Sequence, residues 1–258
     1  MDQQKDAQTP SEATDRRNDT AYWAKPVRTL QTKDVPAGAI DLNVTGRRVV
    51  GATGGFGKLW QKSFSVRLDG AAVTPREVIA TWKEHFADFW PKGQRMFLPA
   101  AGVAPGEVGL INARTMPGAP QMASGILVTY ADDESFSFIG AEGLPFAGPL
   151  TFSAAEDAGS TVVRVDELTR ASDPFWELSL MMPVLRDRQN EIWRATLRNV
   201  AKHFGVDARV ESRIVCIDAR WQWSQAKNIW QNAAIRSGLY TAAAPFRSIA
   251  RALRRPRR

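Results

Sequence analysis

The sequence has little cysteine, histidine or tyrosine. One cysteine, two histidines and three tyrosines occur among 258 residues. Because Cys216 has no second cysteine to pair with inside the chain, an internal disulfide is excluded and a reducing compartment is favoured. The histidines and the cysteine are scattered and show no metal-ligand spacing. We therefore expect no metal site and no other cofactor.

Long apolar runs and a leader-like segment are also missing. No stretch approaches the roughly 18 to 20 apolar residues that a membrane-spanning helix needs. The first 20 residues are polar and lack the apolar centre of a secretory signal. Because they cannot bury enough apolar surface to offset the entropy of ordering, we expect them to be disordered. Together these absences predict a cytoplasmic protein.

Positive charge is concentrated near one end of the chain. The formal net charge is +7, yet residues 209–258 alone hold eleven Lys and Arg against Glu211 and Asp218. The rest of the chain is therefore close to neutral. A basic segment of this kind is attracted to anionic membranes or to nucleic acid by charge alone.

Apolar residues are abundant, at 44% of the chain with nine Trp and twelve Phe, so a sizeable core is expected. The pattern at 58–68 predicts a strand that ends at Asp69-Gly70. Thr74, Pro75 and Glu77 form a capping-box pattern for a helix over 75–90, along which apolar residues recur at helical spacing. That spacing predicts a buried Trp82.

Short strands separated by turn residues are predicted from about 94 to 170. A helical pattern then opens at Asp173, is interrupted by Pro183 and stops at Gly205, which suits a helix C-terminus. Short connections imply antiparallel neighbours, and a curved antiparallel sheet must cover its apolar concave face. The long final helix is available to cover it, and the divergence of helix and sheet at one end would leave a cavity.

The sequence therefore predicts an α+β fold in which a curved antiparallel sheet wraps around a long C-terminal helix. We expect four parts: a disordered segment at 1–20, an irregular arm at 21–57, a ligand-binding domain at 58–205 and a helical basic tail at 206–258.

Four strings resemble the helix-grip fold of the START-like (SRPBCC) superfamily, which includes the polyketide cyclases and the Bet v 1-type proteins. They are GFGKLWQKSF at 55–64, WKEHFADFWP at 82–91, EGLPFAGPLTFSA at 142–154 and RASDPFWEL at 170–178. The resemblance covers about 55–205 and points to an uncharacterised bacterial branch. It implies binding of a hydrophobic small molecule or lipid, without naming the ligand or a reaction.

The glycine-rich segment Gly51–Gly57 is similar to a dinucleotide-binding turn, but its context differs. Such a turn needs a helix directly after the glycines, whereas a strand pattern follows here. A phosphate-binding loop is also excluded, because Leu59 follows Lys58 where Ser or Thr is required. We expect no nucleotide at this segment.

Polar residues inside apolar strands are candidates for a ligand cavity. Asn112, Arg114 and Glu167 either face solvent, as alternation along a strand allows, or orient the polar end of a ligand inside the cavity. Phe136, Phe138 and Phe152 either line the cavity or pack the core, and Met181 beside Pro183 suits an adaptable wall. The complete set of cavity candidates is Asn112, Arg114, Phe136, Phe138, Phe152, Val163, Val165, Glu167, Met181 and Trp193.

In the tail, Trp221, Trp223 and Trp230 lie in a segment from about 215 to 236 that we expect to be helical. After Pro245 the apolar and basic residues occupy opposite faces of a short amphipathic pattern. A solvated basic tail is the alternative. The candidates for contact with a membrane or polyanion are Phe246, Arg247, Ile249, Arg251, Leu253, Arg254 and Arg255.

Three functions are compatible with these features. The first is a non-catalytic binder or carrier of a hydrophobic small molecule or lipid, located at an anionic membrane through its tail. The second is an enzyme of cyclase or hydrolase type that uses the same cavity, although no catalytic motif is present. The third is an interaction module whose tail binds a partner or nucleic acid, for which no sequence-specific recognition motif is found. The oligomeric state is left open.

Overall fold

The computed structural model describes residues 19–33, 35–91, 93–114 and 121–244. Within these ranges the chain forms one antiparallel sheet with the strand order β2-β3-β4-β5-β7-β8-β1-β9, and β6 pairs with β8. The strands are β1 (Leu59–Arg67), β2 (Gln94–Phe97), β3 (Val108–Ala113), β4 (Met122–Ala131), β5 (Ser135–Gly140), β6 (Phe146–Ala147), β7 (Pro149–Asp157), β8 (Ser160–Ala171) and β9 (Glu211–Asp218). The helices are α1 (Pro75–Glu84), α2 (Pro174–Met181), α3 (Pro183–His203) and α4 (Ala233–Ala242), with short 3-10 helices η1 (Asp19–Tyr22), η2 (Ala52–Gly54) and η3 (Trp223–Gln231).

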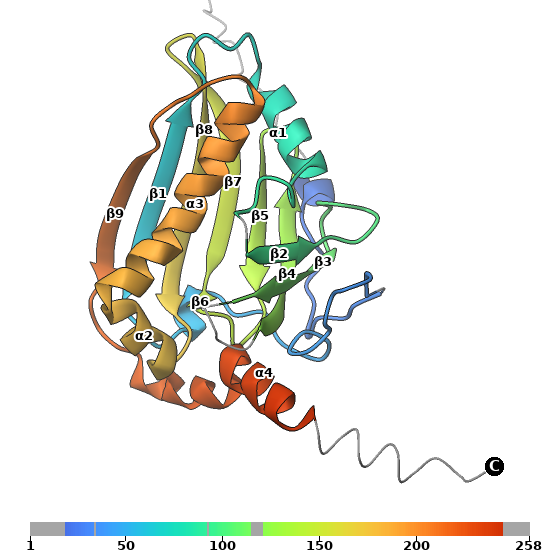
Figure 1. Ribbon diagram of the computed structural model, residues 1–258, viewed down its shortest axis with the longest axis vertical. Helices are drawn as coiled ribbons and strands as arrows, with labels where there is room; N and C mark the ends of the chain where they lie inside the picture. Colours follow the sequence, from blue (N-terminus) through green and yellow to red (C-terminus); the bar gives the residue numbers. More distant parts are fainter. Residues whose placement is uncertain (1–18, 34, 92, 115–120, 245–258) are drawn as a thin grey trace, which may run out of the picture.

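The sheet curves around α3, whose 21 residues run diagonally across the concave face (Figure 1). α1 covers the same face next to β7, and α2 joins the lower end of α3 (Figure 1). The predicted α+β class, the helix-grip arrangement and the order of strand, helix, strands and long helix are confirmed.

Local signals place the helix ends. The Thr74 side chain accepts a hydrogen bond from Glu77 N, and the Glu77 carboxylate accepts one from Thr74 N at 2.8 Å, so the predicted capping box is present. The expected end at residue 90 was wrong, because the chain leaves helical geometry at His85. The turn that follows keeps Phe86 and Phe89 buried without continuing the helix. Pro183 separates α2 from α3, as predicted.

Aromatic side chains fill the upper half of the concave face. Trp82, fully buried as predicted, lies edge-on to Phe152 with ring centroids 5.1 Å apart and edge-on to Phe136 at 5.8 Å. Phe136 and Phe152 stack on each other at 4.8 Å. Close packing of this kind leaves no room for a ligand at this end.

A second, smaller core lies on the outer face of the sheet. Residues from the N-terminal arm, Leu30 and Val44, pack against Leu110 of β3 and Leu127 of β4. Asn112 shares this outer face, and its Nδ2 donates to Gly38 O at 3.0 Å. The expectation that Asn112 lines the cavity was therefore wrong, because the arm covers the face on which it lies.

The segment after residue 205 differs from the expected helical tail. Glu211–Asp218 forms β9, which pairs with β1 at the edge of the sheet, so the sheet extends beyond the predicted limit of the domain. Seven of the eight β9 residues are exposed, which removes the alternation by which a strand is recognised in sequence. Helical structure begins at Trp223, and Asn232 caps α4 through hydrogen bonds from Ala234 N and Ile235 N.

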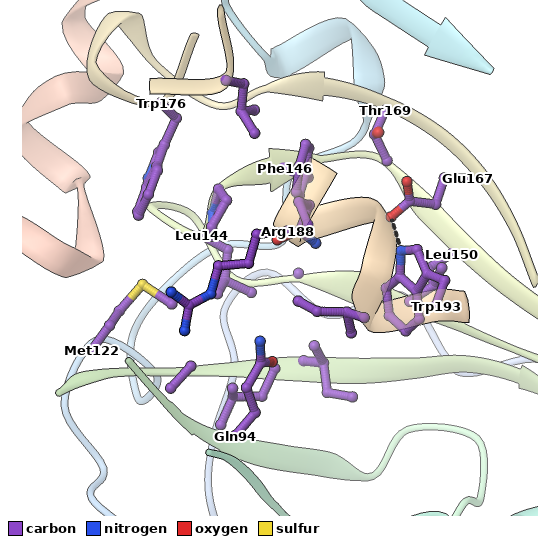
Figure 2. A pocket seen from close by; sticks show the side chains of 18 of the residues that line it. Gln94, Met122, Leu144, Phe146, Leu150, Glu167, Thr169, Trp176, Arg188 and Trp193 are labelled. Carbon is purple, nitrogen blue, oxygen red and sulfur yellow. Dashed lines mark hydrogen bonds between the residues drawn. The ribbon is translucent and has the colours of Figure 1, made fainter. Parts of the chain in front are cut away.

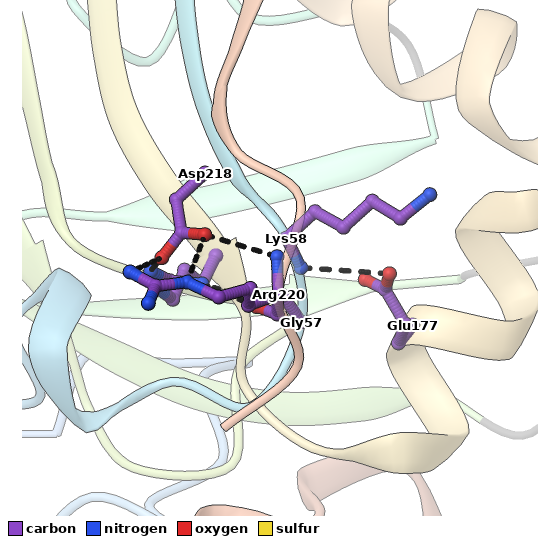
Figure 3. Close-up of polar contacts among 6 residues, drawn as sticks. Gly57, Lys58, Glu177, Asp218 and Arg220 are labelled. Carbon is purple, nitrogen blue, oxygen red and sulfur yellow. Dashed lines mark hydrogen bonds and ion pairs between the residues drawn. The ribbon is translucent and has the colours of Figure 1, made fainter. Parts of the chain in front are cut away.

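The glycine-rich segment has a packing role. A Cβ at Gly57 would lie 2.8 Å from the Cβ of Ala171, which cannot turn aside, so glycine is favoured where the chain enters β1 beside β8. Figure 3 shows the polar contacts around this point, where Asp218 at the end of β9 is held by Arg220 and Glu177 accepts from Lys58 N. Arg170 of β8 also pairs with Asp218, at 2.7 Å. The Arg220 side chain, the Arg220 backbone N–H and Arg170 hold the pKa of Asp218 well below its usual range.

Candidate ligand-binding cavity

A cavity of about 210 Å³ lies in the lower half of the concave face, where α2 and α3 diverge from β2–β5. Figure 2 shows it from close by. α3 contributes one wall, the strands contribute the opposite wall, and the loop around Phe146 and the β8 residues Glu167 and Thr169 close one end. Most of the surface is apolar, supplied mainly by Met96, Ile111, Ile126, Phe138, Leu150 and Ile192.

Two arginines mark where the cavity meets solvent. Arg114 follows β3, and Arg188 lies in the second turn of α3; both are exposed and both line the cavity. Neither takes part in an ion pair with any other described residue. Phe175 of α2, 40% exposed, also reaches this opening. The cavity therefore opens between the α2–α3 junction and the end of β3, with free positive charge at its rim.

The opposite end of the cavity carries a buried ion pair. Lys62 of β1 and Glu167 of β8 are register partners. The apolar pair Phe64 and Val165 lies two residues further along each strand, on the same face of the sheet. Lys62 Nζ lies 3.2 Å from Glu167 Oε2, and both side chains are less than 8% exposed. Of the two, Glu167 lines the cavity. Since a buried ion pair contributes little net stability, the Glu167 carboxylate is a candidate for contact with a ligand.

Neighbouring side chains fix this pair. Glu167 Oε1 accepts a hydrogen bond from Trp193 Nε1 at 2.7 Å, drawn as a dashed line in Figure 2. Lys62 Nζ donates to Asn190 Oδ1 at 3.2 Å and lies 4.8 Å from the centre of the Phe146 ring. β1, β8 and α3 together therefore hold the carboxylate and the ammonium in one geometry.

The structure brings together four of the ten predicted cavity residues. Arg114, Phe138, Glu167 and Trp193 line the cavity, and their contact with a ligand stays a prediction. Met181 does not line it and is 53% exposed, because Pro183 ends α2 with this side chain turned outward. The others lie outside the cavity: Asn112 on the outer face, and Phe136, Phe152, Val163 and Val165 in the core beside it.

Lys62, Thr169 and Arg188 were not predicted. For Lys62 a signal was available, because Trp60, Lys62 and Phe64 alternate and therefore share one face of the strand. For Thr169 the same alternation from Glu167 applied. Arg188 carried no signal, because an arginine on a helix ordinarily faces solvent.

A second hollow, of about 280 Å³, lies beside the glycine-rich segment at Gly51 and Gly54. Its polar side chains are occupied by other parts of the protein. Asn228 Nδ2 donates to Gly54 O and to Ser172 O, and Arg48 pairs with Glu142 at 3.1 Å. We therefore take the first cavity as the candidate site.

The residues predicted to contact a membrane or polyanion lie outside the described part of the chain, in 245–258. They are Phe246, Arg247, Ile249, Arg251, Leu253, Arg254 and Arg255. Among the described residues no helix is long and apolar enough to cross a membrane.

Comparisons with known proteins bear on the fold. No protein-family model matches the sequence, and no curated protein matches it. Solved structures similar to it include Ara h 8.0201 (10% identity, 56% of this chain and 96% of that chain, TM-score 0.41). The di-domain ARO/CYC StfQ from the steffimycin biosynthetic pathway is 10% identical over 57% of this chain and 53% of that chain, with a TM-score of 0.43. A Thalictrum norcoclaurine synthase is 13% identical over 57% of this chain and 97% of that chain, with a TM-score of 0.41.

Structures this weakly similar to the chain give no basis for assigning it a function. The structure itself shows the fold, a curved antiparallel sheet around α3, and the function has to be argued from the cavity.

Proposed function

We propose that the protein binds or carries a hydrophobic small molecule or lipid in the cavity between α3 and the sheet. The supporting observation is an apolar space of about 210 Å³ with a few polar groups gathered at its ends, which is the composition typical of small-molecule sites. An apolar cavity of about 150 Å³ takes up benzene, so this one admits a ring-sized group. A longer apolar chain would extend through the opening near Arg114 and Arg188.

Native mass spectrometry of freshly purified protein tests whether a small molecule is retained. Fluorescence of anilinonaphthalene sulfonate provides a second measurement, for which Ile192→Trp fills the cavity from α3. Val184→Trp places the same side chain on the exposed side of that helix, 78% exposed, and serves as the matched control. We expect dye binding to fall at least tenfold in the first variant only. Equal dye binding by both variants would refute the cavity as the site.

An enzyme that uses the same cavity is the alternative, favoured by one observation. Glu167 is a buried carboxylate at the cavity wall, and a carboxylate there is able to take part in proton transfer. Turnover separates the two functions: a carrier returns the retained molecule unchanged, whereas an enzyme converts it. Loss of conversion in Glu167→Gln, with the molecule still bound, would support the enzyme.

We further propose that the lower end of the molecule contacts an anionic membrane. α2 and α4 lie at this end (Figure 1), and η3 leads into α4. Seven apolar side chains in these segments and at the start of α3 are each more than half exposed: Leu178, Met181, Met182, Val184, Trp223, Trp230 and Leu239. Exposed aromatic and aliphatic groups suit a membrane interface, and the six arginines within 247–258 add electrostatic attraction.

Cosedimentation with vesicles tests this second part. We expect binding to phosphatidylserine-containing vesicles but not to pure phosphatidylcholine, weakened by salt because charge is screened. Replacing the six arginines with glutamine should remove most of the binding, and Trp223→Ala with Trp230→Ala should reduce it at high salt. If wild-type protein does not sediment at low salt but binds DNA or RNA there, the tail is a nucleic-acid contact instead.

A further inference from the structure

Two polar atoms at the inner end of the cavity lack a hydrogen-bond partner. Glu167 Oε2 has only the ionic contact with Lys62 and accepts no hydrogen bond from the described residues. Thr169 Oγ1 has no partner within the described chain either. Thr169 is 3% exposed and Glu167 is 4% exposed, so bulk solvent does not satisfy them. A buried hydroxyl without a partner is costly and therefore uncommon, so Thr169 Oγ1, next to a carboxylate oxygen whose one contact is ionic, points to a ligand group at this wall.

The two atoms lie close enough to share one ligand group. Glu167 and Thr169 are two residues apart on β8, so their side chains leave the same face about 6 to 7 Å apart along the strand. Both line the cavity, and Figure 2 shows them side by side on its wall. A carboxylate oxygen only accepts hydrogen bonds, whereas a threonine hydroxyl both donates and accepts.

A carboxylate oxygen beside a threonine hydroxyl favours one kind of polar group on the ligand. A hydroxyl group on the ligand donates to Glu167 Oε2 and accepts from Thr169 Oγ1, which satisfies both atoms. A carboxylate would lie against the Glu167 carboxylate, and an ammonium would add to the charge of Lys62 without a counter-ion. Because charge buried without a partner is strongly unfavourable, the neutral hydroxyl is selected over both.

We propose that the cavity binds a neutral alcohol or phenol, with its hydroxyl between Glu167 and Thr169 and its apolar body against Ile126, Phe138 and Ile192. This inference rests on the proposed function and specifies the polar end of the molecule that the cavity takes up. Trp193, Lys62 and Asn190 act as positioning residues, because their contacts hold the Glu167 carboxylate in place.

The test compares naphthol with naphthalene, which lacks only the hydroxyl, in competition with anilinonaphthalene sulfonate. Wild-type protein should bind naphthol about tenfold more tightly, the ratio expected for a net gain of about one hydrogen bond. Thr169→Val, which removes the hydroxyl with little change of volume, should abolish most of that preference while leaving the affinity for naphthalene unchanged. Thr169→Ser should retain the preference.

Thr196→Val is the matched control. Thr196 is fully buried in α3, does not line the cavity and donates to Ile192 O, so its loss should leave the preference intact. Equal binding of the two compounds by wild-type protein, or a preference that survives Thr169→Val, would overturn the hydroxyl site. Tightest binding of naphthoic acid would also overturn it and indicate recognition of an anion by Arg114 and Arg188. If no compound binds and no molecule is retained in native mass spectrometry, the proposed function itself fails.

Discussion

The concave face of the sheet is filled differently at its two ends. At the upper end, near α1, the side chains of Trp82, Phe86, Phe136 and Phe152 are at most 1% exposed and contact one another edge-on or stacked. At the lower end the same strands continue into a cavity whose inner wall carries Glu167, with Lys62 paired to it. One sheet and one helix thus make both a packed core and a binding space, because α1 covers the first end and nothing in the described chain fills the second.

The largest loss of stability should come from a substitution at the tightly packed upper end, near α1. Trp82→Ala removes a fully buried indole from between two phenylalanine rings, and we expect a loss of about 3 to 5 kcal/mol in the free energy of unfolding. Trp230→Ala, at a site 79% exposed, should change it by less than about 0.5 kcal/mol. Urea denaturation of both variants measures the difference. Similar stability of the two would show that the upper end is not the main core.

The second-largest loss of stability should come from breaking the buried ion pair between Lys62 and Glu167. Glu167→Leu leaves the buried Lys62 ammonium without its counter-ion, with contacts only to Asn190 and the Phe146 ring among the described residues, and we expect a loss of roughly 3 kcal/mol. Adding Lys62→Met removes the uncompensated charge and should recover most of the loss. A double variant no more stable than the single one would mean that the loss does not come from an uncompensated charge on Lys62.

A smaller loss of stability is expected when a side chain that lines the cavity is shortened. Ile192 is half-buried and already faces open space, so Ile192→Ala should cost only about 1 kcal/mol, well below the loss for a packed core residue. Leu197→Ala, fully buried on the same helix, is the comparison and should cost at least twice as much. Equal losses in thermal or urea denaturation would contradict the presence of a cavity beside Ile192.

The smallest effect on stability should come from the charge of Asp218, and it should depend on pH. The pKa of Asp218 is held below its ordinary value by Arg220 and Arg170, so the ionised carboxylate stabilises the folded state above about pH 4. The contribution is lost as pH falls below that value toward the lowered pKa. The melting temperature of wild-type protein should therefore exceed that of Asp218→Asn by a constant margin between about pH 5 and 7, and the margin should shrink toward about pH 2. A margin independent of pH would rule out this charge effect.

The elements that the sequence predicted well are those with local signals. Thr74 and Glu77 mark the start of α1, Pro183 marks the break between α2 and α3, and Gly205, with φ of 75°, follows the end of α3. These signals depend on residues a few positions apart, so they are readable without knowledge of the fold. β9 lacked such a signal, because its side chains are exposed on both faces and only its backbone bonds to β1 define it.

The sequence by itself determined the class of the fold, the burial of Trp82 and the lack of a helix after the glycine-rich segment, because periodicity and capping are short-range properties. Tertiary structure decided which face each strand turns to the cavity. It placed Asn112 under the arm, set Lys62 opposite Glu167 and left Thr169 Oγ1 without a hydrogen-bond partner among the residues that the structure describes. These outcomes depend on contacts between residues about 70 to 105 positions apart, which the spacing of residues along one segment does not encode.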